Sequence, residues 1–375
     1  MMFEKLGDIA TIKTGKYDVN HSTPDGEYVF YTCAFGQFKS PTYSFEGPAI
    51  ILPGNGANVG EVFYYDGKFE AYQRTYVVQN FKADPNYIYA YFKAQWKNSL
   101  RNKQFGSATN YIRLNNLTDF KIPLPPLPDQ LHIANLLSKA ENLIAQRKES
   151  IRLLDEFLKS TFLEMFGDPS SNRKQFPKGS IRDVVAEVKY GTSSPAEDEG
   201  LYPYLRMNNI TPDGYMDYSK LKYINIVDEK EKEKYVVRKG DLLFNRTNSK
   251  ELVGKTGVFN EDSEMIIAGY LIRVRTNEKA NPWFLWGYLN SIHGKQTLLG
   301  MCKSIVGMAN INAQELQGIK ILIPQIELQT QFAQIVKKTE ALKTQYQQSL
   351  QELENLYGSL SRKAFRGELG VKEMA

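Results

Sequence analysis

The chain has 375 residues, a formal net charge of +5 and a hydrophobic fraction of 42%, which predicts two or three folded domains and excludes a disordered polar chain. Its two cysteines and three histidines are scattered, so we expect neither a disulfide framework nor a metal site, and a reducing, cytoplasmic location. No apolar run reaches the length of a transmembrane helix, so we expect no membrane partner.

Residues 1–124 are predicted to fold as a strand-rich domain. Turns with glycine, proline or asparagine separate short runs of aromatic and β-branched residues at 28–31, 49–52, 61–65 and 76–78. A helical stretch at about 85–103 follows, and the segment ends at the proline-rich run 122–128. Because proline fixes its own backbone, this run makes a stiff lead into the next element.

A single long helix is predicted over 129–166. Apolar or small residues recur there in steps of four and three, interrupted where Arg147 takes one position: Ile133, Leu137, Ala140, Ile144, Ile151, Leu154, Leu158, Thr161 and Met165. This heptad pattern is typical of a helix whose narrow stripe packs on another helix. At ~1.5 Å per residue the helix is roughly 55 Å long, far beyond an ordinary globular helix.

The second half of the chain repeats the plan of the first. After a break at 167–172, Ile181-Arg-Asp-Val-Val corresponds to Leu6-Gly-Asp-Ile-Ala, and a second long helix is predicted at 327–365. Its seam consists of Leu328, Phe332, Ile335, Leu342, Tyr346, Leu353 and Leu360. We therefore predict an α+β fold with two globular domains and two long helices, which form an antiparallel coiled coil and relate the halves by a pseudo-two-fold axis.

Two strings look catalytic, and the repeat serves as a control for them. Asn281-Pro-Trp-Phe284 resembles the Asn-Pro-Pro-Phe string of amino-group DNA methyltransferases, but its counterpart Asp84-Pro-Asn-Tyr87 indicates a plain helix start. Gly254-Lys-Thr256 is half of a phosphate-binding loop, but strand-like residues follow where such a loop needs a helix. We therefore predict no catalytic residues.

Two alternative functions stay open at this stage. Asp213, Asp228 and Lys230 match the acid–acid–lysine spacing of many metal-dependent nucleases, although the same strings are typical of a turn and a solvated charge run. A single-chain Mg²⁺-dependent nuclease is therefore one alternative. The other is a scaffold protein whose coiled coil organises other proteins and which binds DNA weakly, without sequence preference.

Local charge favours nucleic-acid binding. Residues 85–118 and 279–314 contain no acidic residue but several basic ones, which is typical of a surface that faces phosphates. Base recognition requires forked or amide side chains at loop or strand ends. The candidate DNA-binding residues are Gln73, Arg74, Lys103, Asn110 and Arg113 in the first half, and Arg206, Asn208, Asn209, Arg246, Asn248, Lys250 and Lys303 in the second.

The ordered strings resemble the specificity subunits of type I restriction–modification systems over almost the full length. The resemblance is carried by the two domain openings, by Leu205-Arg-Met-Asn-Asn-Ile210, and by the Ile-Pro-Leu-Pro and Leu-Ile-Pro segments before the helices. It implies target recognition domains at 1–124 and 169–323, a central long helix at 125–168 and a C-terminal long helix at 324–375. It further implies that the two dissimilar domains recognise different halves of a split DNA site, with the gap set by the coiled coil.

The resemblance also implies a non-catalytic subunit. In such systems two modification subunits carry S-adenosylmethionine and methylate adenine at N6, and restriction subunits translocate and cut DNA with ATP and Mg²⁺. We therefore expect no cofactor on this chain. The expected partners are double-stranded DNA, two modification subunits, and restriction or translocase subunits.

Overall fold

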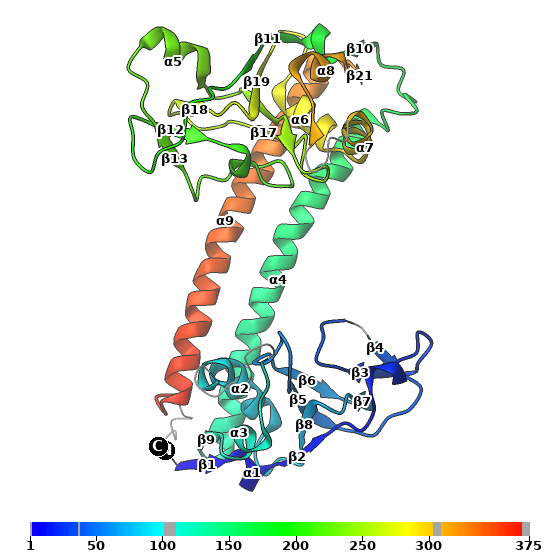
Figure 1. Cartoon of the computed structure of the whole chain (residues 1–375), viewed down its shortest axis with the longest axis vertical. Helices are drawn as coiled ribbons and strands as arrows, with labels where there is room; N and C mark the ends of the chain where they lie inside the picture. Colours follow the sequence, from blue (N-terminus) through cyan, green and yellow to red (C-terminus); the bar gives the residue numbers. More distant parts are fainter. Residues whose placement is uncertain (1, 37, 101–109, 303–308, 370–375) are drawn as a thin grey trace. The chain divides into compact units, whose positions relative to one another are not determined.

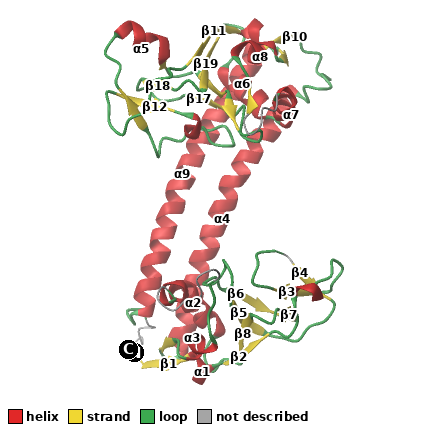
Figure 2. Cartoon of the chain, in the orientation of Figure 1, coloured by secondary structure: helices red, strands yellow, loops and turns green. Residues whose placement is uncertain are grey.

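The structure, a computed structural model of the chain, describes residues 2–36, 38–100, 110–302 and 309–369. The chain forms two compact units, each of which mixes helices and strands (Figure 1, Figure 2). Unit 1 contains residues 1–148 and 348–375, and unit 2 contains residues 149–347. The long helices α4 (Leu127–Phe166) and α9 (Ile326–Phe365) each contribute to both units.

The described part of the domain of unit 1 contains three small sheets. Its elements are β1 (Met2–Lys5), α1 (Leu6–Ile9), β2 (Thr11–Thr14), β3 (Tyr28–Tyr31), β4 (Phe38–Ser40), β5 (Pro48–Pro53), β6 (Phe63–Asp66), β7 (Phe69–Ala71), β8 (Thr75–Gln79), α2 (Pro85–Ser99), α3 (Leu114–Thr118) and β9 (Lys121–Leu124). Strands β2-β8-β5-β6 form an antiparallel sheet, and β4-β3-β7 form a second sheet in which β3 and β7 run parallel. β1 pairs with β9, the strand that precedes α4.

The domain of unit 2 is larger. Its elements are β10 (Lys178–Ser180), β11 (Val185–Tyr190), β12 (Tyr202–Leu205), β13 (Lys222–Ile224), α5 (Glu229–Tyr235), β14 (Val236–Val237), β15 (Leu242–Asn245), β16 (Thr247–Asn248), β17 (Thr256–Val258), β18 (Met265–Ile267), β19 (Leu271–Thr276), α6 (Pro282–Asn290), α7 (Ile292–Met301), β20 (Ala309–Asn310), α8 (Ala313–Gly318) and β21 (Lys320–Leu322).

The strand order of unit 2 repeats that of unit 1. Strands β11-β19-β15-β17 correspond to β2-β8-β5-β6, and the parallel pair β12–β18 corresponds to β3–β7. β10 pairs with β21 as β1 pairs with β9. Unit 2 adds α5 and β14, and it has two helices, α6 and α7, where unit 1 has the single helix α2. The predicted α+β class and internal repeat are therefore confirmed.

A buried glutamine ties each domain to its long helix. The backbone N–H of Asp84, just before α2, donates a hydrogen bond to Gln130 Oε1 of α4 at 2.9 Å. Equivalently, the N–H of Asn281, just before α6, donates to Gln329 Oε1 of α9 at 2.9 Å. Each glutamine also donates to the carbonyl of the proline five residues earlier, at 2.8 Å. The two domains are therefore attached to their helices by the same contacts.

The long helices pair in antiparallel fashion within each unit. In unit 1, Leu137 of α4 and Phe365 at the end of α9 belong to one buried apolar cluster. In unit 2, the rings of Phe162 of α4 and Phe332 near the start of α9 are 5.4 Å apart. Because residue numbers rise along one helix where they fall along the other, the predicted antiparallel coiled coil is confirmed. Both helices begin within two residues of the predicted starts.

The seam of α9 departs from the prediction near its middle. Leu342 is 37% exposed, whereas Thr339 and Lys343 are buried. The Lys343 ammonium pairs with Asp155 of α4 at 2.5 Å and lies 3.8 Å from the centre of the Tyr215 ring. Because its charge is paired, a lysine occupies the seam where the apolar pattern had placed a leucine.

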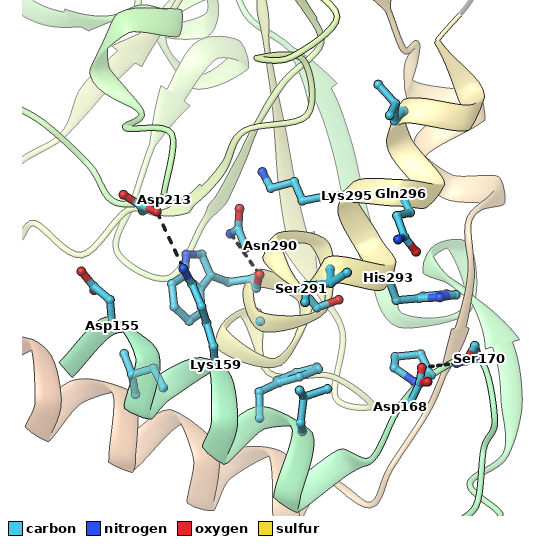
Figure 3. A pocket seen from close by; sticks show the side chains of 18 of the residues that line it. Asp155, Lys159, Asp168, Ser170, Asp213, Asn290, Ser291, His293, Lys295 and Gln296 are labelled. Atoms are coloured by element: carbon cyan, nitrogen blue, oxygen red, sulfur yellow. Dashed lines mark hydrogen bonds and ion pairs between the residues drawn. The ribbon is translucent and has the colours of Figure 1, made fainter. Parts of the chain in front are cut away.

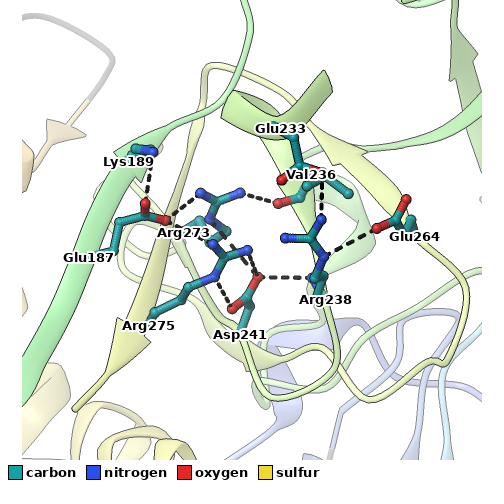
Figure 4. Close-up of polar contacts among 9 residues, drawn as sticks. All are labelled: Glu187, Lys189, Glu233, Val236, Arg238, Asp241, Glu264, Arg273 and Arg275. Carbon is teal, nitrogen blue, oxygen red and sulfur yellow. Dashed lines mark hydrogen bonds and ion pairs between the residues drawn. The ribbon is translucent and has the colours of Figure 1, made fainter. Parts of the chain in front are cut away.

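An ionic network is built around two arginines of strand β19 in unit 2. Arg273 of β19 is fully buried and donates to Glu187 and to the Val236 carbonyl, and its Nε atom lies 4.0 Å from Asp241 (Figure 4). The equivalent residue of unit 1 is Val77, which pairs with β2 and β5 as Arg273 pairs with β11 and β15. The same strand position is therefore apolar in one unit and charged in the other.

Candidate nucleic-acid interface

Three segments of unit 1 meet at what we call the first loop edge: 54–56, 72–74 and 110–113. The Gly54 N–H donates to the Arg74 carbonyl at 2.9 Å, and the Ile112 N–H donates to the Gly54 carbonyl at 3.0 Å. A Cβ atom at Gly54 would lie 2.2 Å from the Arg74 carbonyl oxygen, so this close approach requires glycine. The edge brings together the predicted residues Arg74, Asn110 and Arg113.

Unit 2 has an equivalent second loop edge, formed by segments 246–248, 268–270 and 309–312. The Arg246 N–H donates to the Tyr270 carbonyl at 3.0 Å, and the Ile311 N–H donates to the Arg246 carbonyl at 2.9 Å. Strands β16 and β20 pair within this edge. The predicted residues Arg246 and Asn248 therefore lie where the first loop edge has Gly54 and its neighbours.

Both loop edges present oriented cations. The six segments that define them contain no aspartate or glutamate. The Arg113 guanidinium lies 6.0 Å from the centre of the Tyr111 ring, and that of Arg246 lies 4.7 Å from the Tyr190 ring. Stacking on an aromatic ring pre-organises the guanidinium plane for bidentate binding. Such surfaces are suited to phosphates and base edges.

Arg206 and Asn208 extend the second loop edge, but Asn209 does not. The Ala268 N–H donates to the Leu205 carbonyl at 2.9 Å, so the residues after β12 lie beside segment 268–270. Asn208 is exposed, whereas Asn209 is 2% exposed. The Asn209 amide oxygen accepts from Arg206 N, and its amide nitrogen donates to the Asp217 carbonyl. The Asn209 side chain therefore closes a turn beneath the surface in this structure, and its contact with DNA stays a prediction.

The remaining predicted residues are placed differently. Gln73 is exposed and donates to Asp18 at 3.0 Å, which holds its amide within the domain. Lys250 is exposed in the loop after β16. Lys103 and Lys303 lie outside the described residues. A direct contact with DNA remains a prediction for every residue at the two edges.

Two residues of the second loop edge were missed by the sequence reasoning. Tyr270 is 53% exposed and stands where the first loop edge has Arg74. Asn310 accepts hydrogen bonds from Arg246 Nε at 3.2 Å and Thr247 Oγ1 at 2.9 Å. Arg74 was already a candidate, so aligning the two sequence repeats at that residue would have identified Tyr270 as its counterpart.

The two catalytic-looking strings have structural roles. Asn281 accepts a hydrogen bond from Trp283 N at 3.0 Å and caps α6, as Asp84 caps α2. Lys255 is buried and donates to the carbonyls of Met207, at 2.8 Å, and Ile210. Burial lowers the pKa of Lys255, and a strand rather than a helix follows it. Neither string forms a methyltransferase motif or a phosphate-binding loop.

The residues of the nuclease alternative are engaged separately. Asp213 lies 3.9 Å from Lys159 of α4, whereas Asp228 caps α5 by accepting from Lys230 N at 2.9 Å. Over the described ranges, no group of three or more histidine, cysteine, aspartate or glutamate side chains is placed to hold a metal ion. None of the helices described here combines the length and apolar character that a membrane span requires.

Comparison with protein families gives one match that spans both halves. A family model described as "Type I restriction modification DNA specificity domain" matches residues 1–153 and 175–355. The chain is 25% identical over 407 residues to the type I restriction enzyme EcoDI specificity subunit of Escherichia coli, across 97% of this chain and 88% of the relative. It is 23% identical over 346 residues to the MjaVIII specificity subunit of Methanocaldococcus jannaschii, across 87% and 80% of the two chains.

Solved structures show the same fold. The S subunit of a type I restriction–modification system from M. genitalium matches with a TM-score of 0.66 and 16% identity, over 97% of this chain and 96% of that one. A chain from a structure of complex assembly and conformational transition in a type I system matches with a TM-score of 0.52 and 20% identity, over 98% of each chain. At these identities the likeness concerns the fold alone.

Proposed function

Because the chain belongs to the type I restriction–modification DNA specificity family, we propose that it binds an asymmetric, bipartite site in double-stranded DNA. It is a specificity subunit, the recognition component and not the catalytic one. In this proposal each loop edge recognises one half-site. One observation carries it: the two edges are built by equivalent backbone contacts, yet Arg74 of the first is replaced by Tyr270 in the second, and Gly54 by Arg246.

The proposal is tested by variants at the two edges. Arg246→Ala is expected to weaken binding of the cognate duplex roughly 5- to 100-fold and to relax selectivity only at the second half-site, because a base contact by a guanidinium contributes about 1–3 kcal/mol. Arg74→Ala is expected to do the same at the other half-site. The site is first identified by comparing the methylomes of a host with and without the gene, and affinities are then measured by fluorescence anisotropy.

A matched control is Lys239→Ala. Lys239 is exposed, pairs with Asp262 at 2.7 Å and belongs to neither loop edge. Its loss is expected to change affinity less than about twofold, as for a peripheral surface charge. If both arginine variants weaken all duplexes equally, whichever half-site is altered, the edges contact only the backbone and the proposed readout is wrong.

We also propose that the coiled coil sets the gap between the half-sites. The proposal is supported by the continuity of α4 and α9, each a single helix of 40 residues that belongs to both units. Inserting one heptad after Lys148 and another after Gln347 lengthens both helices by ~10 Å at ~1.5 Å per residue. The recognised spacer is expected to grow by about three base pairs at ~3.4 Å per pair. Methylome sequencing measures this change.

A seven-residue insertion in the exposed loop at 196–200 is the control, and it is expected to leave the spacer unchanged. An unchanged spacer in the double-heptad variant, with methylation retained, contradicts the proposal.

Partner subunits are proposed to dock on the long helices. Leu143, Leu153 and Phe157 of α4 are each about half exposed, at 50%, 49% and 50%. Leu153 and Phe157 are neighbours at i and i+4 on the helix surface, and contiguous exposed apolar surface is typical of a protein interface. We propose that two modification subunits and the restriction subunits assemble there, and that S-adenosylmethionine, ATP and Mg²⁺ bind to those partners. A lone nuclease and a scaffold without DNA are not favoured by the family membership.

A further inference from the structure

Unit 2 contains a cavity of about 860 Å³ between α4 and the two helices α6 and α7. Its walls are largely apolar and include Leu158 and Phe162 of α4, Trp286 of α6 and Leu299 of α7. The volume lies in the range that accommodates a small organic ligand. All of its lining residues belong to unit 2.

Lys295 is the cation of this cavity that has unused hydrogen-bonding capacity, and Asn290 lies in the wall beside it with its amide fixed. The Asn290 amide nitrogen donates to the carbonyls of Thr256 and Trp286, which fixes the amide, but its Oδ1 atom is buried and has no hydrogen-bond partner among the described residues. Lys295 of α7 is partly buried, and it also has no hydrogen-bond or ion-pair partner among the described residues. Figure 3 shows Asn290 and Lys295 among the residues that line the cavity, with Lys159 extending from α4 toward Asp213.

The charges around Lys295 only partly compensate its burial. The pKa of Lys295 is lowered to about 8, chiefly by burial; Lys255 and Lys159 contribute to the lowering, and Asp213 opposes it. Asp213 is shared with Lys159, at 3.9 Å. A partly buried ammonium that shares its counterion with another lysine is incompletely compensated, and an anion bound in the cavity adds the missing negative charge.

Unit 1 is built differently at the corresponding position. There α2 is one continuous helix, and its Lys93 pairs with Glu141 of α4 at 2.7 Å. In unit 2 the helix is broken at Ser291, whose hydroxyl caps α7 by accepting from Gly294 N at 3.0 Å. Lys295 therefore lies on α7, after the helix break that distinguishes unit 2 from unit 1, and the cavity lies beside it.

We propose that this cavity binds a small amphipathic anion. Its aromatic or branched aliphatic body packs against Trp286, Phe162 and Leu299, and its carboxylate or sulfonate binds Lys295. The site is independent of the loop edges, so its test does not depend on DNA binding.

Two probes that differ only in charge test the proposal on the full chain. 8-Anilinonaphthalene-1-sulfonate has an aromatic body, an N–H and a sulfonate, and N-phenyl-1-naphthylamine lacks the sulfonate. Fluorescence titration is expected to show one saturable site for the sulfonate. Lys295→Met is expected to weaken the sulfonate about 10- to 100-fold, the effect of losing a hydrogen bond to a charged group, and the neutral probe less than about twofold. Retained binding of the neutral probe shows that the variant is folded.

Two further variants and a pH series complete the test. Leu299→Trp fills the cavity and is expected to abolish binding of both probes, whereas Lys220→Met, an exposed lysine outside the cavity, is expected to change neither. Raising the pH from 7 to 9 deprotonates Lys295 and is expected to weaken the sulfonate in the unmodified chain but not in Lys295→Met. Unchanged sulfonate affinity in Lys295→Met, unchanged binding in Leu299→Trp, or binding without saturation would overturn the proposal.

Discussion

Replacing Arg273 with methionine is expected to lower the free energy of unfolding of unit 2 by roughly 3 kcal/mol, the lower end of the range for a broken buried ion pair. Methionine fills much of the same volume but removes the guanidinium that donates to the Val236 carbonyl and to Glu187. The loss is limited because Arg275 still contacts Asp241 at 2.8 Å and Glu187 at 3.1 Å.

The measurement is urea unfolding followed by tryptophan fluorescence. Trp283 and Trp286 report on unit 2, and Trp96 reports on unit 1. Arg238→Met is the matched control, since Arg238 pairs with Glu233 at 2.6 Å but is 43% exposed, and it is expected to cost less than about 1 kcal/mol. If Arg273→Met and Arg238→Met lower the free energy of unfolding equally, burial of Arg273 does not explain its contribution to stability.

The long helices and the repeat were predictable because apolar periodicity is a local property of the sequence. The steps of four and three located α4 and α9 to within two residues of their starts. The buried charges were not predictable in this way. Arginine and lysine are usually exposed, so their residue type gives no sign of burial. Arg273 and Lys343 are buried because residues distant in the sequence pair with their charges. Asp155, the partner of Lys343, is 188 positions away in the chain.

The loop edges were predictable in part. Arg74, Asn110 and Arg113 were identified from residue type and local charge, and the structure gathers them at one edge. Asn209 has the same residue type but closes a turn. An amide in a loop can bind a ligand or stabilise the backbone, and only its hydrogen-bond partners distinguish the two roles. Tyr270 was missed because a lone tyrosine carries no charge signal.

Glu340 of α9 makes the stability of unit 2 depend on pH. Its Oε1 atom is buried and has no hydrogen-bond partner in the described part of the chain. The pKa of Glu340 is raised from its ordinary value of 4.5 to about 7, chiefly by burial; Lys343 opposes the shift, and the nearby Asp155 contributes to it. Tyr215, whose own pKa burial raises, also faces the carboxyl group.

The sign of the effect follows from linkage. A carboxyl group whose pKa is higher in the folded state stabilises that state while it is protonated, so the contribution is complete below about pH 4.5 and is lost as the pH rises through about 7. At ~1.4 kcal/mol per pKa unit the loss by pH 8.5 is about 3 kcal/mol. Glu340→Gln, which keeps the neutral shape, is expected to match the unmodified chain at pH 5 and to exceed its stability at pH 8.5 by up to about 3 kcal/mol.

Glu141 provides the control for Glu340, because it occupies the same place in the repeat on α4. It accepts hydrogen bonds from Lys93 at 2.7 Å and from Tyr357 at 2.6 Å, so its charge is compensated. Glu141→Gln removes that compensation and is expected to destabilise unit 1 at pH 8.5 by roughly 1–2 kcal/mol, the opposite sign to Glu340→Gln. Urea unfolding at pH 5 and 8.5, resolved by the tryptophans of each unit, measures both changes. If the pH dependence of unit 2 is the same in Glu340→Gln as in the unmodified chain, another group is responsible for it.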